Sequence, residues 1–376
     1  MQSKFVDVDG HILESPNLWA EYLEPKYKDR ALRLRKDEKG LEYLEIDGKK
    51  SWFMRGGTLG LIGGYGKDPK PFLEPGKIDY ADARKDQVGS FDPDARIKIM
   101  DKEGIDISII YPSLGLCWES ECKDPELSAA LCRAYNNWLF DFCKPHPSRL
   151  IAAAHIPMRD VGEAVKELRR CAKLGAKAAM VNSYLAGAPA YGSSYYDPLW
   201  AEAQELDIPI TLHASNADDW AGSKYYPNVG DMPTWYTFVT SIQDLQLNIT
   251  TLFGEGTFEK FPRLKVVILE AGCGWLRTWL DRMDDVYKLF HFTTKMKLKP
   301  SEYFERQCWI SMNVEEGFAP EIIKTVGAHK FVWAFDYPHS DGGLDPLKHL
   351  KKTLEKLPKD DQHKVFGANA MNLYKL

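Results

Sequence analysis

Several common signatures are missing from this 376-residue chain, and each absence excludes a class of protein. The chain has no Lys/Arg-rich block and its formal net charge is -5, which argues against a nucleic-acid-binding surface. The amino terminus lacks the apolar core of a signal peptide, and no apolar run is long enough to cross a bilayer. We therefore expect neither nucleic acid nor a membrane as a partner.

Disulfide and nucleotide-binding motifs are missing as well. The seven cysteines are odd in number and contain no C-x-x-C pair, which is typical of reduced thiols in a cytoplasmic protein. Residues 56–66 are rich in glycine, but the G-x-x-x-x-G-K-[ST] pattern of a phosphate loop does not occur. No G-x-G-x-x-G follows the first strand, so an open doubly wound sheet is only the second choice of fold.

What the chain has is a regular alternation of apolar runs and helical segments. Eight apolar runs predict strands at residues 4–8, 105–111, 150–156, 176–181, 208–212, 264–269, 308–312 and 331–335. Among the segments between them, 235–260 predicts one long helix, and 360–373 predicts a closing helix. Near-continuous apolar strands belong to a sheet that is buried on both faces. We predict an α/β fold, a single (β/α)₈ barrel domain over residues 1–376.

One long segment interrupts this alternation after the first strand. Residues 15–40 predict a helix followed by a loop. Asp47-Gly48 separates the apolar segments 41–46 and 50–54 and is a hairpin signal. We interpret residues 15–90 as an insertion whose hairpin lies over the mouth of the barrel.

The first strand runs into an acid–x–acid–x–His sequence formed by Asp7, Asp9 and His11. Because side chains alternate between the two faces of a strand, these three groups are expected on one face. Their burial is costly unless a cation lies among them, and a divalent metal is the simplest candidate. The alternative is a surface turn, which Asp-Gly also favours.

Three other strand ends carry a polar side chain directly after an apolar run. They are His213 after strand five, Glu270 after strand six and Asp336 after strand eight. Each has an ordinary explanation, such as a satisfied core histidine or an ion pair with arginine. In a barrel, however, the carboxyl ends of the strands meet at one point, and this coincidence favours a metal site.

These motifs resemble the amidohydrolase superfamily, in particular the branch with aminocarboxymuconate semialdehyde decarboxylase and the resorcylate-type decarboxylases. The resemblance also includes RIKIMDKEGID at 96–106, FPRLK at 261–265, GWL at 274–276, DYPH at 336–339 and FGANAMNLY at 366–374. It implies the metal ligands Asp9, His11, His213 and Asp336. It further implies a divalent transition metal, zinc in most of the family, and a homodimer.

Strand six departs from this family pattern. Decarboxylases of the branch have a histidine there, and this chain has Glu270. Glu270 is either a general base or a further metal ligand. As a ligand it would complete an oxygen-rich set that can hold two metals, and such a set favours iron or manganese.

Four further residues are candidates for substrate binding. Arg55 follows the hairpin and is suited to a substrate carboxylate, although a solvated loop arginine is as reasonable. His155 ends strand three, and His339 follows Asp336; each has a structural role as its alternative. Trp220 belongs to an aromatic-rich loop after His213 that is typical of a lid, with core packing as its alternative.

Together these residues predict a metal-dependent hydrolase acting on a small, aromatic or apolar acid-type substrate. Metal-bound water would attack an ester, thioester, amide or ketone-like carbon, with Glu270 or Asp336 accepting the proton and His213 completing the catalytic group. One alternative is non-oxidative decarboxylation of an aromatic or unsaturated acid. Another is an inactive barrel that acts as a binding protein.

Overall fold

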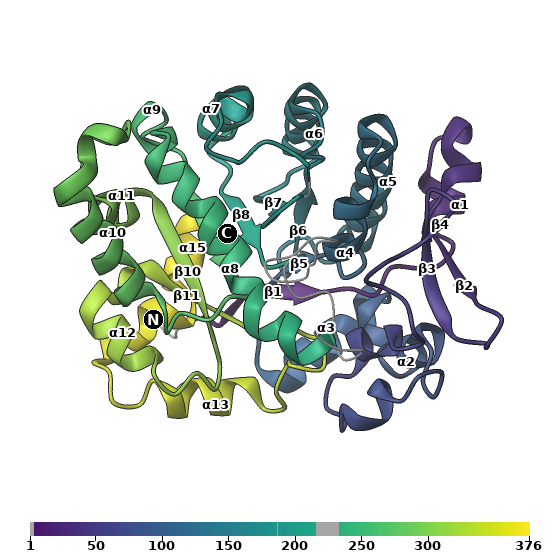
Figure 1. The fold of residues 1–376 in the computed structure, drawn as a ribbon. Helices are drawn as coiled ribbons and strands as arrows, with labels where there is room; N and C mark the ends of the chain where they lie inside the picture. The colour runs from purple at the N-terminus through teal and green to yellow at the C-terminus, as the bar shows by residue number, and fades with distance from the viewer. Residues whose placement is uncertain (1–3, 186, 216–232) are drawn as a thin grey trace.

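The computed structural model describes residues 4–185, 187–215 and 233–376. Eight parallel strands form a nearly closed barrel in the order β1-β5-β6-β7-β8-β9-β10-β11 (Figure 1). They are β1 (Val6–His11), β5 (Ile107–Tyr111), β6 (Leu150–His155), β7 (Ala178–Asn182), β8 (Ile210–His213), β9 (Val266–Leu269), β10 (Cys308–Asn313) and β11 (Phe331–Ala334). All eight predicted strands are present, and the (β/α)₈ prediction is confirmed.

Helices surround these strands (Figure 1). The α-helices are α1 (Leu18–Tyr22), α2 (Tyr80–Asp86), α3 (Pro93–Glu103), α4 (Gly115–Glu121), α5 (Pro125–Cys143), α6 (Val161–Lys173), α7 (Asp197–Leu206), α8 (Pro233–Gly254), α9 (Thr257–Lys260), α10 (Leu276–Phe290), α11 (Pro300–Gln307), α12 (Ala319–Val326), α13 (Pro346–Thr353), α14 (Lys359–His363) and α15 (Asn369–Tyr374). Short 3₁₀ turns lie at Pro25–Arg30, Leu59–Gly63, Lys70–Leu73, Val88–Ser90, Ser194–Tyr196, His291–Thr293 and Ala328–Lys330.

Local sequence fixes several helix starts. Asp92, Asp124 and Asp160 precede α3, α5 and α6, and each side chain accepts a main-chain N–H of the first turn. Proline occupies the first position of α3 and α5, where its missing N–H costs nothing. The helices therefore begin where the sequence places an acid before the first turn.

Two predicted helices are interrupted in the structure. The helix predicted over 235–260 breaks between α8 and α9 at Gly256, whose φ is +75° and which leaves no room for a Cβ beside Lys295. The closing helix passes through a π-helical segment, Lys364–Ala368, between α14 and α15. A side chain at Gly367 would collide with the carbonyl oxygen of Lys4. Both interruptions come from close tertiary approaches that a helical pattern does not encode.

The barrel closes between its first and last strands. The Asp336 N–H donates to the Asp9 carbonyl at 2.9 Å, and the His11 N–H donates to the Tyr337 carbonyl at 2.7 Å. One carboxylate oxygen of Asp7 accepts the N–H groups of Phe335 and Asp9, each at 3.0 Å. Asp9, His11 and Asp336 are thereby fixed by the seam itself.

The segment after β1 forms a small sheet of its own. Antiparallel strands β2 (Arg33–Lys36), β3 (Glu42–Ile46) and β4 (Lys49–Lys50) lie to one side of the barrel (Figure 1). Asp47 and Gly48 have φ values of +50° and +72°, which the predicted Asp-Gly turn requires. Strand β2 is absent from the predicted helix plus loop, and most of the predicted second arm, 50–54, is not strand.

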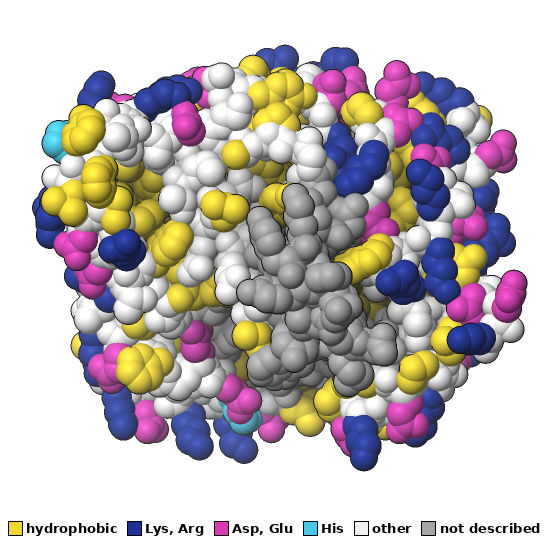
Figure 2. Space-filling view, in the orientation of Figure 1, with side chains coloured by type: hydrophobic (Ala, Val, Ile, Leu, Met, Phe, Trp, Pro, Cys, Tyr) yellow, Lys and Arg dark blue, Asp and Glu magenta, His cyan; other side chains and the backbone are white. Residues whose placement is uncertain are grey.

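The surface agrees with the composition. Positive and negative side chains are interspersed around the edge of the face in Figure 2. Within the described ranges, no helix combines the length and apolarity that a bilayer span needs. All seven cysteines are free thiols and buried.

Candidate metal centre

Three donor groups converge at the carboxyl ends of β1 and β8. The Nε2 atom of His213 lies 3.1 Å from Asp9 Oδ1 and 3.3 Å from His11 Nε2. The same Asp9 oxygen lies 3.3 Å from His11 Nε2. All three residues are fully buried. The predicted convergence of strands one and five is therefore present in the structure.

Main-chain carbonyl groups determine which nitrogen of each imidazole presents a lone pair to this cluster. His11 Nδ1 lies 2.8 Å from the carbonyl oxygen of Pro112, and His213 Nδ1 lies 2.7 Å from that of Ala214. A carbonyl oxygen only accepts, so both Nδ1 atoms carry the hydrogen. In the neutral rings Nε2 is then an acceptor, and the two Nε2 atoms face each other and Asp9.

Asp336 adds another acceptor from the end of β11. Its Oδ1 lies 3.2 Å from His11 Nε2, and its backbone has a φ of +62°. Among the described residues, both carboxylate oxygens of Asp336 and Oδ2 of Asp9 are buried without a hydrogen-bond partner. Buried acceptors without donors are costly. Ligands about 2.0–2.2 Å from one ion stand roughly 3.0–3.5 Å apart, so this arrangement fits a divalent cation.

Without a cation, protons must fill the same space. Burial by itself lowers the pKa of the His213 imidazolium, but the charge of Asp9, the hydrogen bonds to Asp9 and Ala214 and the charge of Glu270 together outweigh burial and raise that pKa to about 9. Burial tends to raise the pKa of Asp9, yet His213 and His11 hold it well below its usual range. A metal ion would replace the proton that these groups otherwise share.

Glu270 lies directly behind His213. Its Oε2 is 3.3 Å from His213 Nδ1, on the ring edge that faces away from Asp9, and its backbone has a φ of +50°. Burial raises the pKa of Glu270 to about 8, and His213 only partly offsets this. Glu270 also forms a group with Asp336, His339 and Asp341 in which one donor atom of each lies within 4.8 Å of the others.

His339 packs flat against His11, with ring centroids 4.1 Å apart. Its Nε2 lies 2.7 Å from Ser113 Oγ, and its Nδ1 lies 3.0 Å from Asp336 Oδ1. Burial holds the pKa of His339 well below its ordinary value, so the ring is neutral. His339 is thus in contact with the cluster.

The contacts described for His155 and Arg55 do not include this cluster. Fully buried His155 contacts Glu119 at 3.0 Å and belongs to a separate group with Glu119 and Cys132. Arg55 is exposed, with its guanidinium 5.7 Å from the ring centroid of Trp52. Trp220 lies outside the described residues.

Asp7 does not join the cluster, although alternation along the strand placed it there. The register of β1 against β5 shifts between Asp7 and Gly10, and Asp7 instead accepts the Ser108 hydroxyl at 2.6 Å. Buried Arg96 stands nearby and donates to the His11 carbonyl at 2.6 Å. The irregularity in the strand separates Asp7 from Asp9 and His11.

Two residues near the centre escaped the sequence reasoning. Asp341 follows His339 by two positions, and the row of polar groups after β11 was a signal that could have included it. Glu316 accepts the N–H groups of Cys273 and Gly274, each at 2.7 Å through Oε1, and so holds the turn after Glu270. It lies among charged loop residues, and no pattern in the sequence singles it out.

Fold and site together define a class: a (β/α)₈ barrel with a metal-type donor cluster at the carboxyl ends of strands one, five and eight. The profile of the amidohydrolase family matches residues 6–376, so the chain belongs to that family. The relationship predicted from the motifs is confirmed.

Individual proteins that are similar to this chain include decarboxylases. The chain is 28% identical over 296 residues to gamma-resorcylate decarboxylase from Polaromonas sp., covering 75% of this chain and 87% of that one. An amidohydrolase structure from Mycobacterium avium subsp. paratuberculosis K-10 matches all of both chains with a TM-score of 0.83 and 24% identity. A structure of dihydroxybenzoic acid decarboxylase from Polaromonas sp., solved with manganese and 2-nitroresorcinol, matches with a TM-score of 0.69 and 20% identity. The match covers 100% of this chain and 98% of that one. The structural matches show the shared fold.

Proposed function

We propose that this protein is a metal-dependent, non-oxidative decarboxylase of an aromatic carboxylic acid. The sequence favoured hydrolysis, with decarboxylation as its alternative. The relatives reverse that preference, because the curated protein named above is a resorcylate decarboxylase and a solved structure of the same fold is a dihydroxybenzoic acid decarboxylase. One observation carries the proposal. His11, His213 and Asp336 meet in a buried site, and the Asp336 carboxylate there has no hydrogen-bond partner among the described residues.

In this proposal the cation is held by Asp9, His11, His213 and Asp336. The mixture of two imidazoles and two carboxylates suits manganese as well as zinc. Manganese is the metal in the solved dihydroxybenzoic acid decarboxylase, which supports testing it first. When bound, such an ion acts as a Lewis acid toward the substrate carboxylate and a neighbouring oxygen.

Glu270 supplies the proton that replaces carbon dioxide. As the bond between the ring carbon and the carboxylate breaks, its electron pair stays on the ring carbon, which takes the proton of the Glu270 carboxyl group. Carbon dioxide leaves, and Glu270 recovers a proton from solvent. The raised pKa of Glu270 supports this role, since a carboxyl group with a pKa of about 8 is mostly protonated at neutral pH.

Arg55 is the proposed partner of a substrate oxygen or carboxylate. In the described part of the chain no acidic side chain pairs with it, and its guanidinium lies over the ring of Trp52. A guanidinium in this position is free to bind a carboxylate with two parallel hydrogen bonds. We assign no substrate contact to His155, because its side chain is fully buried against Glu119.

A homodimer in the cytoplasm completes the proposal. The end of α10 and the turn after it leave Leu289, Phe290 and Phe292 exposed to 67%, 51% and 75%. Figure 2 shows hydrophobic side chains among the charged ones on this face. Apolar surface of this kind is suited to contact with a second copy, and sedimentation velocity would measure the oligomeric state.

The decisive experiment follows carbon dioxide release from a panel of hydroxybenzoates by manganese-loaded protein, beside hydrolysis of matched aryl esters and amides. We expect release from at least one hydroxybenzoate and incorporation of one solvent deuterium at the ring carbon. His11→Ala protein, loaded in the same way, serves as the inactive control. Ester or amide hydrolysis without carbon dioxide release would contradict the proposal and restore the hydrolytic alternative.

A further inference from the structure

A second polar group lies at the carboxyl ends of β6 and β7, and the proposed metal centre does not use it. At its middle is Glu119, a fully buried residue of α4. Oε1 of Glu119 accepts the Met158 N–H at 2.9 Å. Oε2 accepts from His155 Nε2 at 3.0 Å and from Asn182 Nδ2 at 3.1 Å. The Glu119 carboxylate therefore has three donors, and it fixes the orientation of two side chains.

Glu119 determines which end of the Asn182 amide is left over. Because a carboxylate oxygen accepts, the amide must turn its NH₂ group toward Glu119 and its oxygen away from it. Asn182 is fully buried, and among the described residues its Oδ1 has no hydrogen-bond partner. A buried acceptor without a donor is costly. Oδ1 of Asn182 therefore calls for a donor that the described chain does not supply.

Strand register places this acceptor beside the metal centre. Asn182 is the partner of His213 in the ladder between β7 and β8. Partners in parallel strands point to the same side, and neighbouring strands lie about 4.8 Å apart. His213 reaches Asp9 on β1, which stands opposite β8 in the order of the eight strands, so its ring points into the barrel mouth. The Asn182 side chain therefore points into the mouth as well, one strand away from a metal ligand.

His155, the other side chain that Glu119 holds, lies deeper in the barrel. It is the register partner of Met180, two residues before Asn182 on β7. Its Nδ1 atom also lacks a hydrogen-bond partner among the described residues, but Gly115 covers that side of the ring. A Cβ at Gly115 would stand only 3.2 Å from Nδ1. Of these two side chains, Asn182 is the one that presents an acceptor at the level of His213.

We infer that Asn182 is a specificity-determining residue whose Oδ1 accepts a hydrogen bond from a hydroxyl or amino group on the substrate ring. The ring group is one that the metal ion does not take. Glu119 is the positioning residue that keeps the amide oxygen directed at it. A buried acceptor rejects a ligand that lacks the matching donor, because the acceptor then stays unpaired. The inference rests on the proposed function and adds a rule by which the same site selects its substrate.

The test compares two rings that cannot lose carbon dioxide, 2-nitroresorcinol and 3-fluoro-2-nitrophenol. The second ring carries fluorine, which donates no hydrogen bond, in place of one hydroxyl group. Calorimetry with manganese-loaded protein measures the dissociation constant of each. We expect 2-nitroresorcinol to bind about tenfold to a hundredfold more tightly. In 3-amino-2-nitrophenol the amino group restores a donor and should recover most of the lost affinity.

Two variants locate the origin of this affinity ratio. Asn182→Leu removes the acceptor at similar volume, so the ratio should fall by about tenfold or more. In Glu119→Gln protein the new amide can itself donate to Oδ1 of Asn182, so the orientation is no longer fixed and the ratio should fall as well. Elemental analysis should find unchanged manganese content in both. A loss of structure alone would not change the preference for a donor on the ring.

The matched control is Asn136→Leu. Asn136 is also fully buried, but both ends of its amide are paired: Nδ2 donates to the His155 carbonyl and to Glu167, and Oδ1 accepts the His155 N–H. The affinity ratio in this variant should equal that of the unmodified protein. A ratio that falls equally in Asn136→Leu and Asn182→Leu would overturn the inference.

The outcomes separate this inference from the proposed function. Equal affinity of the unmodified protein for the two rings, or an unchanged ratio in Asn182→Leu protein, would overturn the inference. Carbon dioxide release from a hydroxybenzoate would still support the proposed function in that case. No binding of either ring would also overturn the inference, and carbon dioxide release alone would then decide the function. A ratio that falls in Asn182→Leu but not in Glu119→Gln would contradict the positioning role of Glu119.

Discussion

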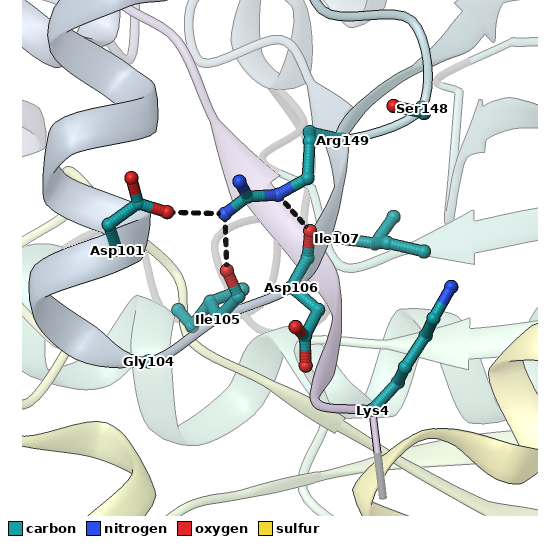
Figure 3. A pocket seen from close by; sticks show the side chains of 8 residues that line it. All are labelled: Lys4, Asp101, Gly104, Ile105, Asp106, Ile107, Ser148 and Arg149. Carbon is teal, nitrogen blue, oxygen red and sulfur yellow. Dashed lines mark hydrogen bonds and ion pairs between the residues drawn. The ribbon is translucent and has the colours of Figure 1, made fainter. Parts of the chain in front are cut away.

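The two ends of the barrel satisfy their hydrogen-bond acceptors in opposite ways. At the amino-terminal end, Figure 3 shows Arg149 pointing into a hollow between α3 and the start of β5. Its guanidinium donates to Asp101 Oδ1 at 2.8 Å, to the Ile105 carbonyl at 2.9 Å and to the Asp106 carbonyl. Acceptors there meet a cation that the chain itself supplies.

At the carboxyl end the acceptors are present and the cation is not part of the chain. Among the described residues, no lysine or arginine pairs with Asp9, Asp336 or Glu270. In a (β/α)₈ barrel the amino-terminal face generally serves stability and the carboxyl face serves function. This contrast shows what distinguishes the functional end: its acceptors have no positively charged side chain as a partner. Burial and the number of acidic residues distinguish it less.

Removing a ligand at the carboxyl end should have the largest effect. His213→Ala leaves Asp9 and His11 without their third partner, so we expect loss of bound metal. Activity should fall by about three orders of magnitude, because a metal supplies several kcal/mol of transition-state stabilisation. Elemental analysis and steady-state kinetics would measure both. His146→Ala, which removes a partly exposed histidine paired with Asp94, is the control and should change neither. Full metal content in His213→Ala protein would contradict the assignment.

Acidification should also weaken the carboxyl end. In metal-free protein the pKa of His213 is raised to about 9, so the ring is protonated below that pH and must lose its proton to bind a metal. The apparent affinity should therefore fall by about tenfold for each unit of pH below 9, roughly a hundredfold between pH 8 and pH 6. Calorimetry in buffers of different ionisation enthalpy would also detect the released proton. An affinity independent of pH over this range would show that no proton is displaced.

Much of this contrast could be predicted from sequence, because strands and their ends leave local signals. Near-continuous apolar runs identified all eight strands. The abrupt polar residues His213, Glu270 and Asp336 marked the functional end, since a buried run ending in a charge needs a partner.

Other features depend on contacts between distant segments. The register shift that removes Asp7 from the cluster, and the tautomers set by Pro112 and Ala214, arise only when strands meet. The role of Ser113 in orienting His339 joins residues 226 positions apart. Periodicity cannot encode such pairings, so the placement of His339 and Asp341 beside Asp336 appeared only in the structure.

At the amino-terminal end the expected effect is on stability alone. Arg149→Ala removes three hydrogen bonds from a partly exposed guanidinium, so we expect a loss of roughly 1–2 kcal/mol in the free energy of unfolding. Metal content and activity should not change. Urea denaturation would measure the free energy of unfolding, and elemental analysis would measure the metal content. Arg149→Lys keeps the charge without the forked geometry. Its free energy of unfolding should therefore lie between those of the unmodified protein and Arg149→Ala. Loss of metal from Arg149→Ala protein would mean that the two ends are not independent.

One part of the carboxyl end resembles the amino-terminal end, because its donors and acceptors are matched. The Glu316 carboxylate accepts the Cys273 N–H at 2.7 Å and 3.0 Å and the Gly274 N–H at 2.7 Å. These N–H groups belong to the turn that begins at Glu270, where φ values of +50° at Glu270 and +57° at Gly272 require support from outside. Glu316 is therefore a positioning residue for Glu270, and it belongs to none of the candidate metal-donor groups found among the described residues.

The smallest effect should follow from weakening this support. Glu316→Gln keeps one acceptor oxygen and loses the charge, so we expect kcat to fall by about fivefold, the factor that corresponds to ~1 kcal/mol of hydrogen bonding. KM and metal occupancy should stay unchanged, because the hydrogen bonds of Glu316 go to Cys273 and Gly274 and not to Asp9, His11 or His213. Glu315→Gln, at the neighbouring position, loses the same charge but touches His349 instead, and kcat should be unaffected. An equal fall in both variants would assign the effect to net charge. A fall confined to Glu316→Gln would show that the functional end, too, depends on matched donors and acceptors wherever geometry must be held without a metal.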